Sequence, residues 1–229
     1  MVPRTYDNSV FLNCPFDPTY RPLFEAVTFA VYDCGFFPRC ALEVDDGSQV
    51  RIEKITTMIA ECRLAVHDIS RTELDAANQL PRFNMPFELG IFVGAKTFGA
   101  SEHRRKACIV FDTDRYRYQK FLSDIAGQDV REHRCSTRAV IQQIRDFLSV
   151  HVDHDAVLPG GRAMAERYRD FRRQFARSCR NLRLDRDHLT FRDLTLLVTS
   201  WIHVNPLPHH GAASSIEPVA VALGTRSPV

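Results

Sequence analysis

The chain has 229 residues, of which 45% are hydrophobic and 25% charged, and its formal net charge is +2. This length allows one α/β domain and an appendage, and the composition is typical of a globular protein. The small net charge favours no particular class of partner. No apolar stretch approaches the roughly 20 residues needed to cross a bilayer, and the first residues hold no apolar signal-peptide core. We therefore expect a cytoplasmic protein that does not associate with membranes.

The first half of the chain alternates strand-like and helix-like segments. Short apolar runs predict strands at 9–13, 36–44, 63–70 and 106–112. Pro38 makes the second of these strands irregular or places it at an edge of a sheet. Helical spacing of apolar residues predicts helices at 20–34, ended by Gly35, at 50–62, with Ser48 as the N-cap, and from near Pro86. This alternation predicts an α/β fold with a parallel sheet and helices on both faces.

Polar side chains follow each predicted strand. Asn13 ends the first strand, Asp45 follows the second, and Asp68 and Ser70 end the third. In open parallel sheets, ligands bind outside the carboxyl ends of the strands, near the point where the strand order reverses. The sequence therefore predicts a ligand site with many carboxylates at this edge.

One carboxylate, Glu88, stands inside the apolar segment "FNMPFELGIFVGAK". If Met85 is the N-cap and Pro86 the first helical residue, Glu88 is the third residue and can cap the helix. The alternative is a buried catalytic carboxylate at the rim of the sheet. Gly90 and Gly94 share one face of this helix and would allow close approach to the sheet or a ligand.

The last third of the chain predicts amphipathic helices at 136–150, 162–186 and 190–202. The second of them has nine arginines against three acidic residues, and Tyr168, Phe171 and Phe175 form an aromatic stripe. Because the arginines are spread round the helix among acidic residues, we expect it not to bind nucleic acid. We expect its aromatic face to dock on another subunit or a partner protein, with the arginines exposed.

The domain boundaries follow from this change of pattern. We expect an α/β domain at 1–135, a helical extension at 136–203, and a disordered tail at 204–229, which is rich in Pro, Gly, Ala and Ser. The seven cysteines form no Cys-x-x-Cys pair, and we interpret them as reduced, small core residues. Two histidines and two aspartates at 151–155 fall in a predicted loop, and we expect no metal site.

Three segments carry a resemblance to a known family. The segments "RLAVHDISR" and "FNMPFELGIFVGAK", with "VFLNCPFDPTYRPLFEAVTFAVYDCGF", resemble parts of nucleoside 2-deoxyribosyltransferases and the wider TIR-like group over residues 9–113. The resemblance implies a flavodoxin-like fold and a glutamate, here Glu88, that attacks or stabilises C1′ of an N-riboside. In place of the transferases' Asp-x-Gly-Thr-type segment, this chain has Phe83, Asn84, Met85 and Pro86. That difference argues against transfer to an ordinary nucleoside acceptor, and the usual sequence surroundings of animal or plant TIR domains are missing as well. The resemblance therefore points to bacterial TIR-like proteins of anti-phage or toxin systems, several of which consume NAD.

The chemistry of N-glycosidic bond cleavage suggests roles for other residues at this edge of the sheet. Asp68 would either join Glu88 in catalysis, by orienting it or by binding ribose hydroxyls, or cap the end of its strand. Phe11, Phe83 and Phe87 would provide apolar walls, and Arg39 or Arg71 would contact a pyrophosphate. The remaining expected substrate-binding residues are Asn13, Asp45, Ser70 and Asn84.

Two hypotheses remain open from the sequence. In the first, the protein is an enzyme that releases nicotinamide from NAD, which is then a substrate, and needs no cofactor. In the second, the pocket binds a nucleotide without chemistry and the C-terminal helices relay the bound state to a partner.

Overall fold

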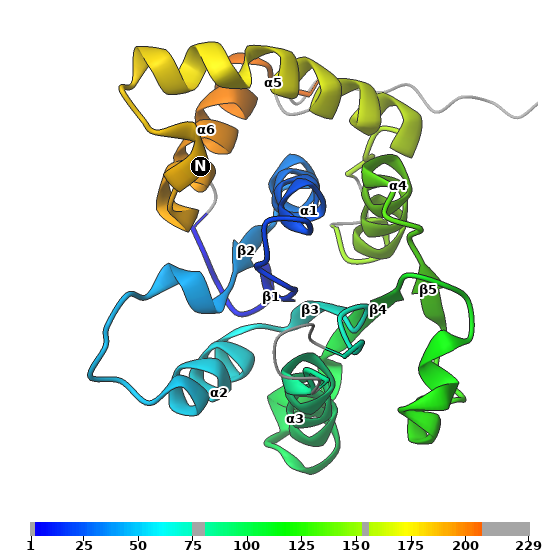
Figure 1. Cartoon of the computed structure of the whole chain (residues 1–229). Coiled ribbons are helices and arrows are strands. Elements are labelled where there is room, and N and C mark those ends of the chain that lie inside the picture. The colour runs from blue at the N-terminus through cyan, green and yellow to red at the C-terminus, as the bar shows by residue number, and fades with distance from the viewer. Residues whose placement is uncertain (1–2, 75–80, 153–155, 208–229) are drawn as a thin grey trace, which may run out of the picture.

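A five-stranded parallel sheet lies at the centre of the protein, which we describe from a computed structural model (Figure 1). The structure describes residues 3–74, 81–152 and 156–207. The strand order is β2-β1-β3-β4-β5. The strands are β1 (Ser9–Asn13), β2 (Phe37–Arg39), β3 (Leu64–Asp68), β4 (Ala107–Asp112) and β5 (Val130–Glu132). This confirms the predicted α/β, flavodoxin-like fold.

Helices cover both faces of the sheet (Figure 1). One face carries α1 (Arg21–Asp33) and α4 (Thr137–Ser149), and the other carries α2 (Arg51–Glu61) and α3 (Asn84–Phe98). Beyond α1 and α4 lie α5 (Gly161–Asn181) and α6 (Phe191–Val204) as an outer layer. Short 3-10 helices are η1 (Ala41–Glu43), η2 (Ser101–Arg105), η3 (Arg117–Lys120), η4 (Ser123–Ile125) and η5 (Arg186–His188). Within the described ranges, no helix is long and apolar enough to span a bilayer.

The structure corrects several predicted boundaries. The second strand is confined to β2, an edge strand containing Pro38, and the chain then turns into η1 instead of continuing to residue 44. Ser48 does not cap α2: its backbone N–H and hydroxyl bind Asp46 in a turn, and Val50 is the N-cap. The strand β5 was not predicted, because three half-buried residues with two charges give no apolar pattern.

Parallel register brings the polar strand ends together. Asn13 pairs with His67 across β1 and β3, and Asp68 pairs with Phe111 across β3 and β4, so Asn13, Asp68 and Asp112 share one edge. The chain passes from β1 to β2 on one side and then crosses to β3 on the other. The strand order therefore reverses between β1 and β3, where parallel sheets bind ligands.

A single apolar cluster fills the side of α1, α4, α5 and α6. The aromatic stripe of α5 is buried in it: Phe29 of α1 lies 5.3 Å from both Tyr168 and Phe171, and Trp201 of α6 lies 6.0 Å from Phe171, between ring centroids. The prediction that this stripe docks on another subunit is therefore wrong, because the chain covers the stripe itself. The cluster also runs across the expected boundary at residue 135.

The thiols follow the same burial. All seven cysteines are free, and five are buried as small core residues. Cys108 is half-buried and Cys135 is exposed, so the prediction of core placement is wrong for Cys135.

Candidate functional site

A cavity of about 640 Å³ opens at the carboxyl ends of β1 and β3. Four segments that are distant in sequence form it: the loop from β1 to α1, the start of α2, the loop after β3, and the start of α3. Its position at the strand-order reversal matches the expected ligand site of this fold. The lining residues are 14–19, Arg51, Arg71, Glu73, Leu74, Arg82, Asn84 and Met85.

Arginines dominate the charges of this cavity. Arg51, Arg71 and Arg82 line it, against the carboxylates of Asp17 and Glu73. Arg71 is held in place, because its Nε lies 3.2 Å from Oδ2 of Asp17. The side chain of Arg51 is 56% exposed. Guanidinium groups bind phosphate oxygens through two parallel hydrogen bonds, so this lining suits an anionic, phosphate-bearing ligand.

Glu88 is buried beside this cavity and does not cap its helix. α3 begins at Asn84 with Phe83 as the N-cap, which makes Glu88 the fifth helical residue and leaves the first turn without an acidic residue. The capping interpretation is therefore wrong. Glu88 is only 4% exposed because this face of α3, with Leu89 and Phe92, packs towards the sheet. Burial raises the pKa of Glu88 to about 7, against the opposing effect of Arg51.

Arg51 connects Glu88 with the cavity. Its Nη2 lies 3.7 Å from Oε1 of Glu88, across a narrow recess that is too small to hold a water molecule. Phe11 and Asn13 line the recess, and it shares Cys14, Phe16, Arg51 and Met85 with the larger cavity. Arg51 therefore stands where it can contact either Glu88 or an anion in the cavity.

Asn13 fastens the start of α3 to the sheet. Its Nδ2 donates to the carbonyl of Met85 and to Nδ1 of His67, each at 2.9 Å. Because the Met85 carbonyl only accepts, the amide orientation is fixed, and Oδ1 of Asn13 has no partner among the described residues. Burial lowers the pKa of His67 to about 3, so this imidazole is neutral and cannot act as an acid near neutral pH. As expected from strand alternation, His67 and Asp68 point to opposite faces.

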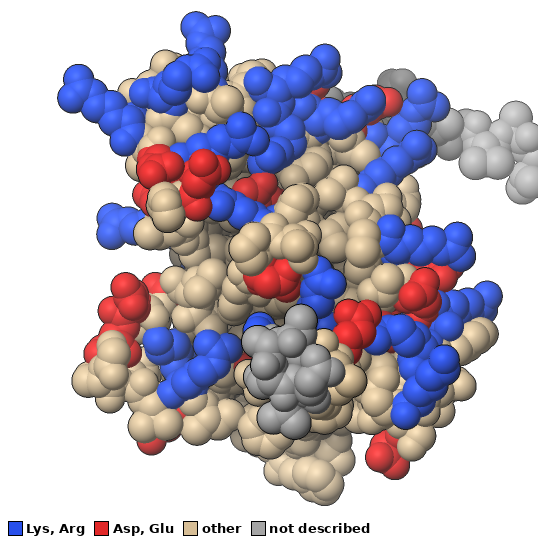
Figure 2. Space-filling model, in the orientation of Figure 1, with Lys and Arg blue, Asp and Glu red and all other residues tan. Residues whose placement is uncertain are grey.

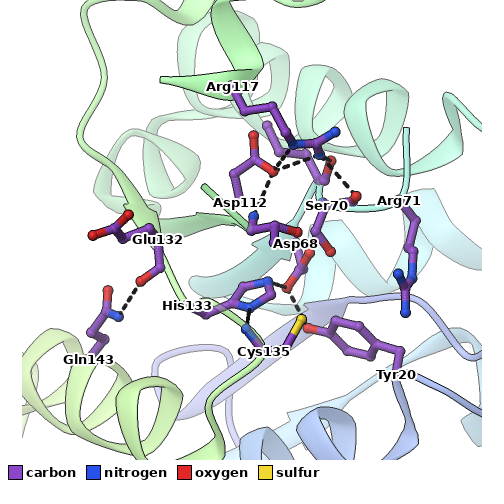
Figure 3. A network of polar contacts seen from close by, with 12 residues as sticks. Tyr20, Asp68, Ser70, Arg71, Asp112, Arg117, Glu132, His133, Cys135 and Gln143 are labelled. Carbon is purple, nitrogen blue, oxygen red and sulfur yellow. Dashed lines mark hydrogen bonds and ion pairs between the residues drawn. The ribbon is translucent and has the colours of Figure 1, made fainter. Parts of the chain in front are cut away.

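Asp68 is enclosed by its own network (Figure 3). Its Oδ2 accepts a 2.5 Å hydrogen bond from the Tyr20 hydroxyl and lies 3.1 Å from Nε2 of His133, and its Oδ1 accepts from the backbone N–H of Ser70. The backbone N–H of Cys135 donates to Nδ1 of His133, so the neutral ring carries its hydrogen on Nε2, towards Asp68.

This network separates Asp68 from Glu88. Asp68 is 0% exposed and lies on the α1 side of the sheet, whereas Glu88 lies on the α3 side. Among the described residues, no hydrogen bond or ion pair joins the two carboxylates. In this structure Asp68 orients Tyr20 and His133, and it neither contacts Glu88 nor reaches the cavity.

Arg117 forms a second polar network at the same edge of the sheet. Arg117 donates from Nε to Oδ1 of Asp112 at 2.8 Å and from Nη2 to the carbonyl of Ser70 at 2.9 Å, which ties the loops after β3 and β4 together (Figure 3). Burial raises the pKa of Asp112 despite this partner. Ser70, 2% exposed, thus serves the loop through its backbone.

The other expected site residues are placed differently. Asn84 is exposed and lines the cavity, and Phe11 is buried at the recess. Phe87 is 61% exposed, and Asp45 lies in the exposed loop before α2, so neither lines the cavity. Arg39 is bound to Glu43 and Glu61, away from it. The backbone around Gly90 and Gly94 is open, so their expected close contact is absent.

Comparison with known protein families, curated proteins and solved structures finds no match for this chain. The chemistry of the site must therefore be read from its own residues. Among the described residues, no three His, Cys, Asp or Glu side chains gather as a metal site. The aspartates and one histidine of the 151–155 stretch lie outside the described residues.

Sequence reasoning missed Arg51, Tyr20 and His133. Arg51 reads as an ordinary first-turn helical residue, and His133 follows the unpredicted β5. Only Tyr20 gave a signal, since an aromatic residue directly before an apolar helix suggests burial against the sheet. Burial also raises the pKa of the Cys14 thiol far above its usual range, so this cavity-lining thiol stays protonated and is a poor nucleophile.

Proposed function

We propose that this protein cleaves the N-glycosidic bond between nicotinamide and ribose in NAD, with Glu88 as the catalytic carboxylate. The observation that supports the proposal most is the burial of Glu88 beside an arginine-lined cavity, with a pKa raised to about 7. Carboxylates with such shifts in clefts are candidates for chemistry. Helix capping, the simplest structural explanation, does not apply to Glu88.

The cavity suits a dinucleotide. Its volume of about 640 Å³ falls within the range of small-molecule sites. Arg51, Arg71 and Arg82 can take the negative charge of a pyrophosphate, and Asn84 at the rim can donate to a ribose hydroxyl. A pyrophosphate that draws Arg51 towards itself would also uncover Glu88, because the same side chain lines the recess.

The reaction needs a negative charge more than it needs an acid. The C1′–N bond breaks, its electron pair moves to the ring nitrogen of oxidised nicotinamide, and the base leaves as a neutral molecule without protonation. Positive charge then develops at C1′, and an ionised Glu88 stabilises it once Arg51 has moved towards the pyrophosphate and uncovered the carboxylate. Water adds to C1′ and loses a proton to solvent. The neutral His67 and the enclosed His133 fit a site that supplies no general acid.

Replacement of Glu88 by Gln tests this assignment. Gln has the same size and removes the charge, so we expect Glu88→Gln to lower nicotinamide release from NAD by roughly a hundredfold or more. Glu53→Gln, the same change at an exposed position in the first turn of α2, is the matched control and should keep full activity. If Glu88→Gln keeps most of the activity, Glu88 is not the catalytic group.

A substrate panel tests the leaving group. Oxidised NAD should be cleaved in preference to reduced NAD, adenosine, inosine or thymidine, whose bases leave without a positive ring nitrogen. Because only ionised Glu88 acts, activity should rise with pH through about 7, and chromatography of the products follows both effects. Cleavage of neutral nucleosides with NAD untouched would contradict the proposal.

A second candidate function is nucleotide binding without chemistry. The recess around Glu88 holds no room for water, which favours a binding role if it stays closed. Calorimetry with NAD decides between the two. Tight binding with no release of nicotinamide from the wild type, and equal affinity in Glu88→Gln, would establish the binding role.

A further inference from the structure

Five arginines form one row along the outer face of α5: Arg162, Arg169, Arg173, Arg177 and Arg180. They are spaced seven, four, four and three residues apart, which places them on one side of a helix. All five are exposed. Figure 2 shows Lys and Arg side chains gathered over the part of the surface where Figure 1 places α5. We call this set the arginine row.

The two remaining arginines of α5 lie on its inner side, which is why the sequence shows arginines all round the helix. Arg167 turns inward and binds both carboxylate oxygens of Asp33, and Arg172 binds Glu25 of α1. These two residues hold α5 on α1, so they are not part of the outer surface. The exposed arginines that remain share one direction, unlike the even distribution that the sequence suggested.

The row has an excess of positive charge. Glu166 and Asp170 are weak, exposed partners of Arg162, Arg169 and Arg173. Arg177 and Arg180 make no ion pair with any described residue. From residue 162 to 192 the chain has ten arginines, four acidic residues and no lysine, although the whole chain has a net charge of only +2.

The start of the row is hollowed. Arg162 and Arg169, with Arg138 of α4, line a surface cavity of about 450 Å³ between the two helices. Glu166 also lines this depression and pairs with Arg162 and Arg169, so the three guanidinium groups face one carboxylate. Because the arginines outnumber it, an anionic group can still be held there from several sides.

We propose that the arginine row binds the phosphate backbone of a double-stranded nucleic acid, without sequence preference. The row spans about 27 Å, from 18 residues at a rise of 1.5 Å each, and a duplex carries one charge per about 1.7 Å of its axis, so several phosphates lie within reach at once. Arginine in place of lysine fits this partner, since its planar fork matches phosphate geometry. This surface is separate from the cavity at the strand ends, and the inference does not depend on the proposed activity.

The structure favours nucleic acid over a membrane surface. Helices that bind bilayers insert an apolar face beneath a basic one. The apolar face of α5 is buried against α1 and α6, with Tyr168, Phe171 and Phe175 between 2% and 6% exposed. This helix can therefore offer charge to a partner but no apolar side chains.

Fluorescence anisotropy with a labelled duplex of about 20 base pairs and mixed sequence tests the inference, as DNA and as RNA, between about 50 and about 200 mM salt. The wild type should bind at least one of the duplexes, and its affinity should fall steeply with salt. The variant Arg169→Ala/Arg177→Ala/Arg180→Ala should bind roughly tenfold or more weakly, with a salt slope smaller by about 2 to 3, close to 0.9 per lost phosphate contact.

A second triple variant controls for net charge. Lys96→Ala/Arg104→Ala/Lys120→Ala removes the same charge from exposed positions outside α5 and should bind within about twofold of the wild type. Circular dichroism checks that both variants fold. Absence of duplex binding at about 50 mM salt would overturn the proposal, as would equal weakening in both variants. Binding to vesicles with anionic lipid but to neither duplex would also overturn it.

Discussion

The two faces of the sheet hold their buried charges differently. On the face of α1, α4, α5 and α6, each buried carboxylate has a direct side-chain partner. Asp33 binds Arg167 through both oxygens, and Asp68 accepts from Tyr20 beside His133. Buried charges with such partners hold helices and loops in place.

On the face of α2 and α3, the buried ionisable groups have fewer charged partners to offset the cost of their burial. Among the described residues, the only ionic partner of Glu88 is the exposed Arg51 at 3.7 Å. Lys106 donates to backbone carbonyls at the end of α2, and the ring of His67 contacts the side-chain amide of Asn13. Burial moves the pKa of Glu88 to about 7, of Lys106 to about 8 and of His67 to about 3. Paired charges therefore connect the elements of this fold, whereas the charge that burial leaves poorly paired beside a cavity is the candidate for chemistry.

Removal of a paired charge should have the largest effect. Asp33→Ala leaves Arg167 without its carboxylate and should lower the free energy of unfolding by about 3 kcal/mol. Urea unfolding measures this, and a double-mutant cycle with Arg167→Ala isolates the pair. A loss below about 1 kcal/mol would contradict the difference between the two faces, because the stability of this face would then not depend on its ion pairs.

On the other face, Glu88→Gln should remove a charge whose burial costs stability, unlike Asp33→Ala. The folded pKa of Glu88, about 7, is above the usual value of 4.5, so the folded state binds more protons between these two values. Relative to Glu88→Gln, the wild type should lose on the order of 2 kcal/mol as pH rises through this window, and the difference should stay constant above it. Urea unfolding of both proteins at about pH 5 and about pH 8 tests this. An unchanged difference would mean that Glu88 is well paired.

Lys106→Met should change the pH dependence of unfolding in the direction opposite to Glu88→Gln. The folded pKa of Lys106, about 8, is below the usual 10.5, so the unfolded state binds more protons between these values. The wild type should therefore gain on the order of 1 kcal/mol relative to Lys106→Met between about pH 7 and about pH 9.5. Thermal unfolding in matched buffers follows the trend. A constant difference would show that the carbonyls of Ile59 and Cys62 fully compensate the charge.

The smallest effect belongs to the exposed side of α5. Arg162→Ala removes a surface pair with Glu166, where the arginine side chain is 84% exposed, and should change the free energy of unfolding by less than about 0.5 kcal/mol. The same urea experiment as for Asp33→Ala gives the result. A change above about 1 kcal/mol would mean that the arginine row also stabilises the fold. The exposed arginines would then not differ in this respect from the inward-facing Arg167 and Arg172.

Local sequence patterns are enough to predict the order and type of most helices and strands. Short continuous apolar runs and apolar residues at helical spacing place β1, β3, β4 and most helices within a few residues of their observed bounds. The sequence also singles out Glu88, because a carboxylate inside an apolar segment has to be either at a helix end or buried. These signals are local, so a single segment is enough to show them.

What those residues do depends on their neighbours in the folded chain. Whether Glu88 caps α3 depends on where the helix starts, and Asn13, from a strand far away in sequence, fixes that start through Met85. The partner of Asp68 is His133, which follows β5, a strand of three residues that forms only beside β4. Which arginines of α5 turn inward depends on Asp33 and Glu25 of α1. Burial and pairing are set by contacts between distant segments, and no local pattern encodes them.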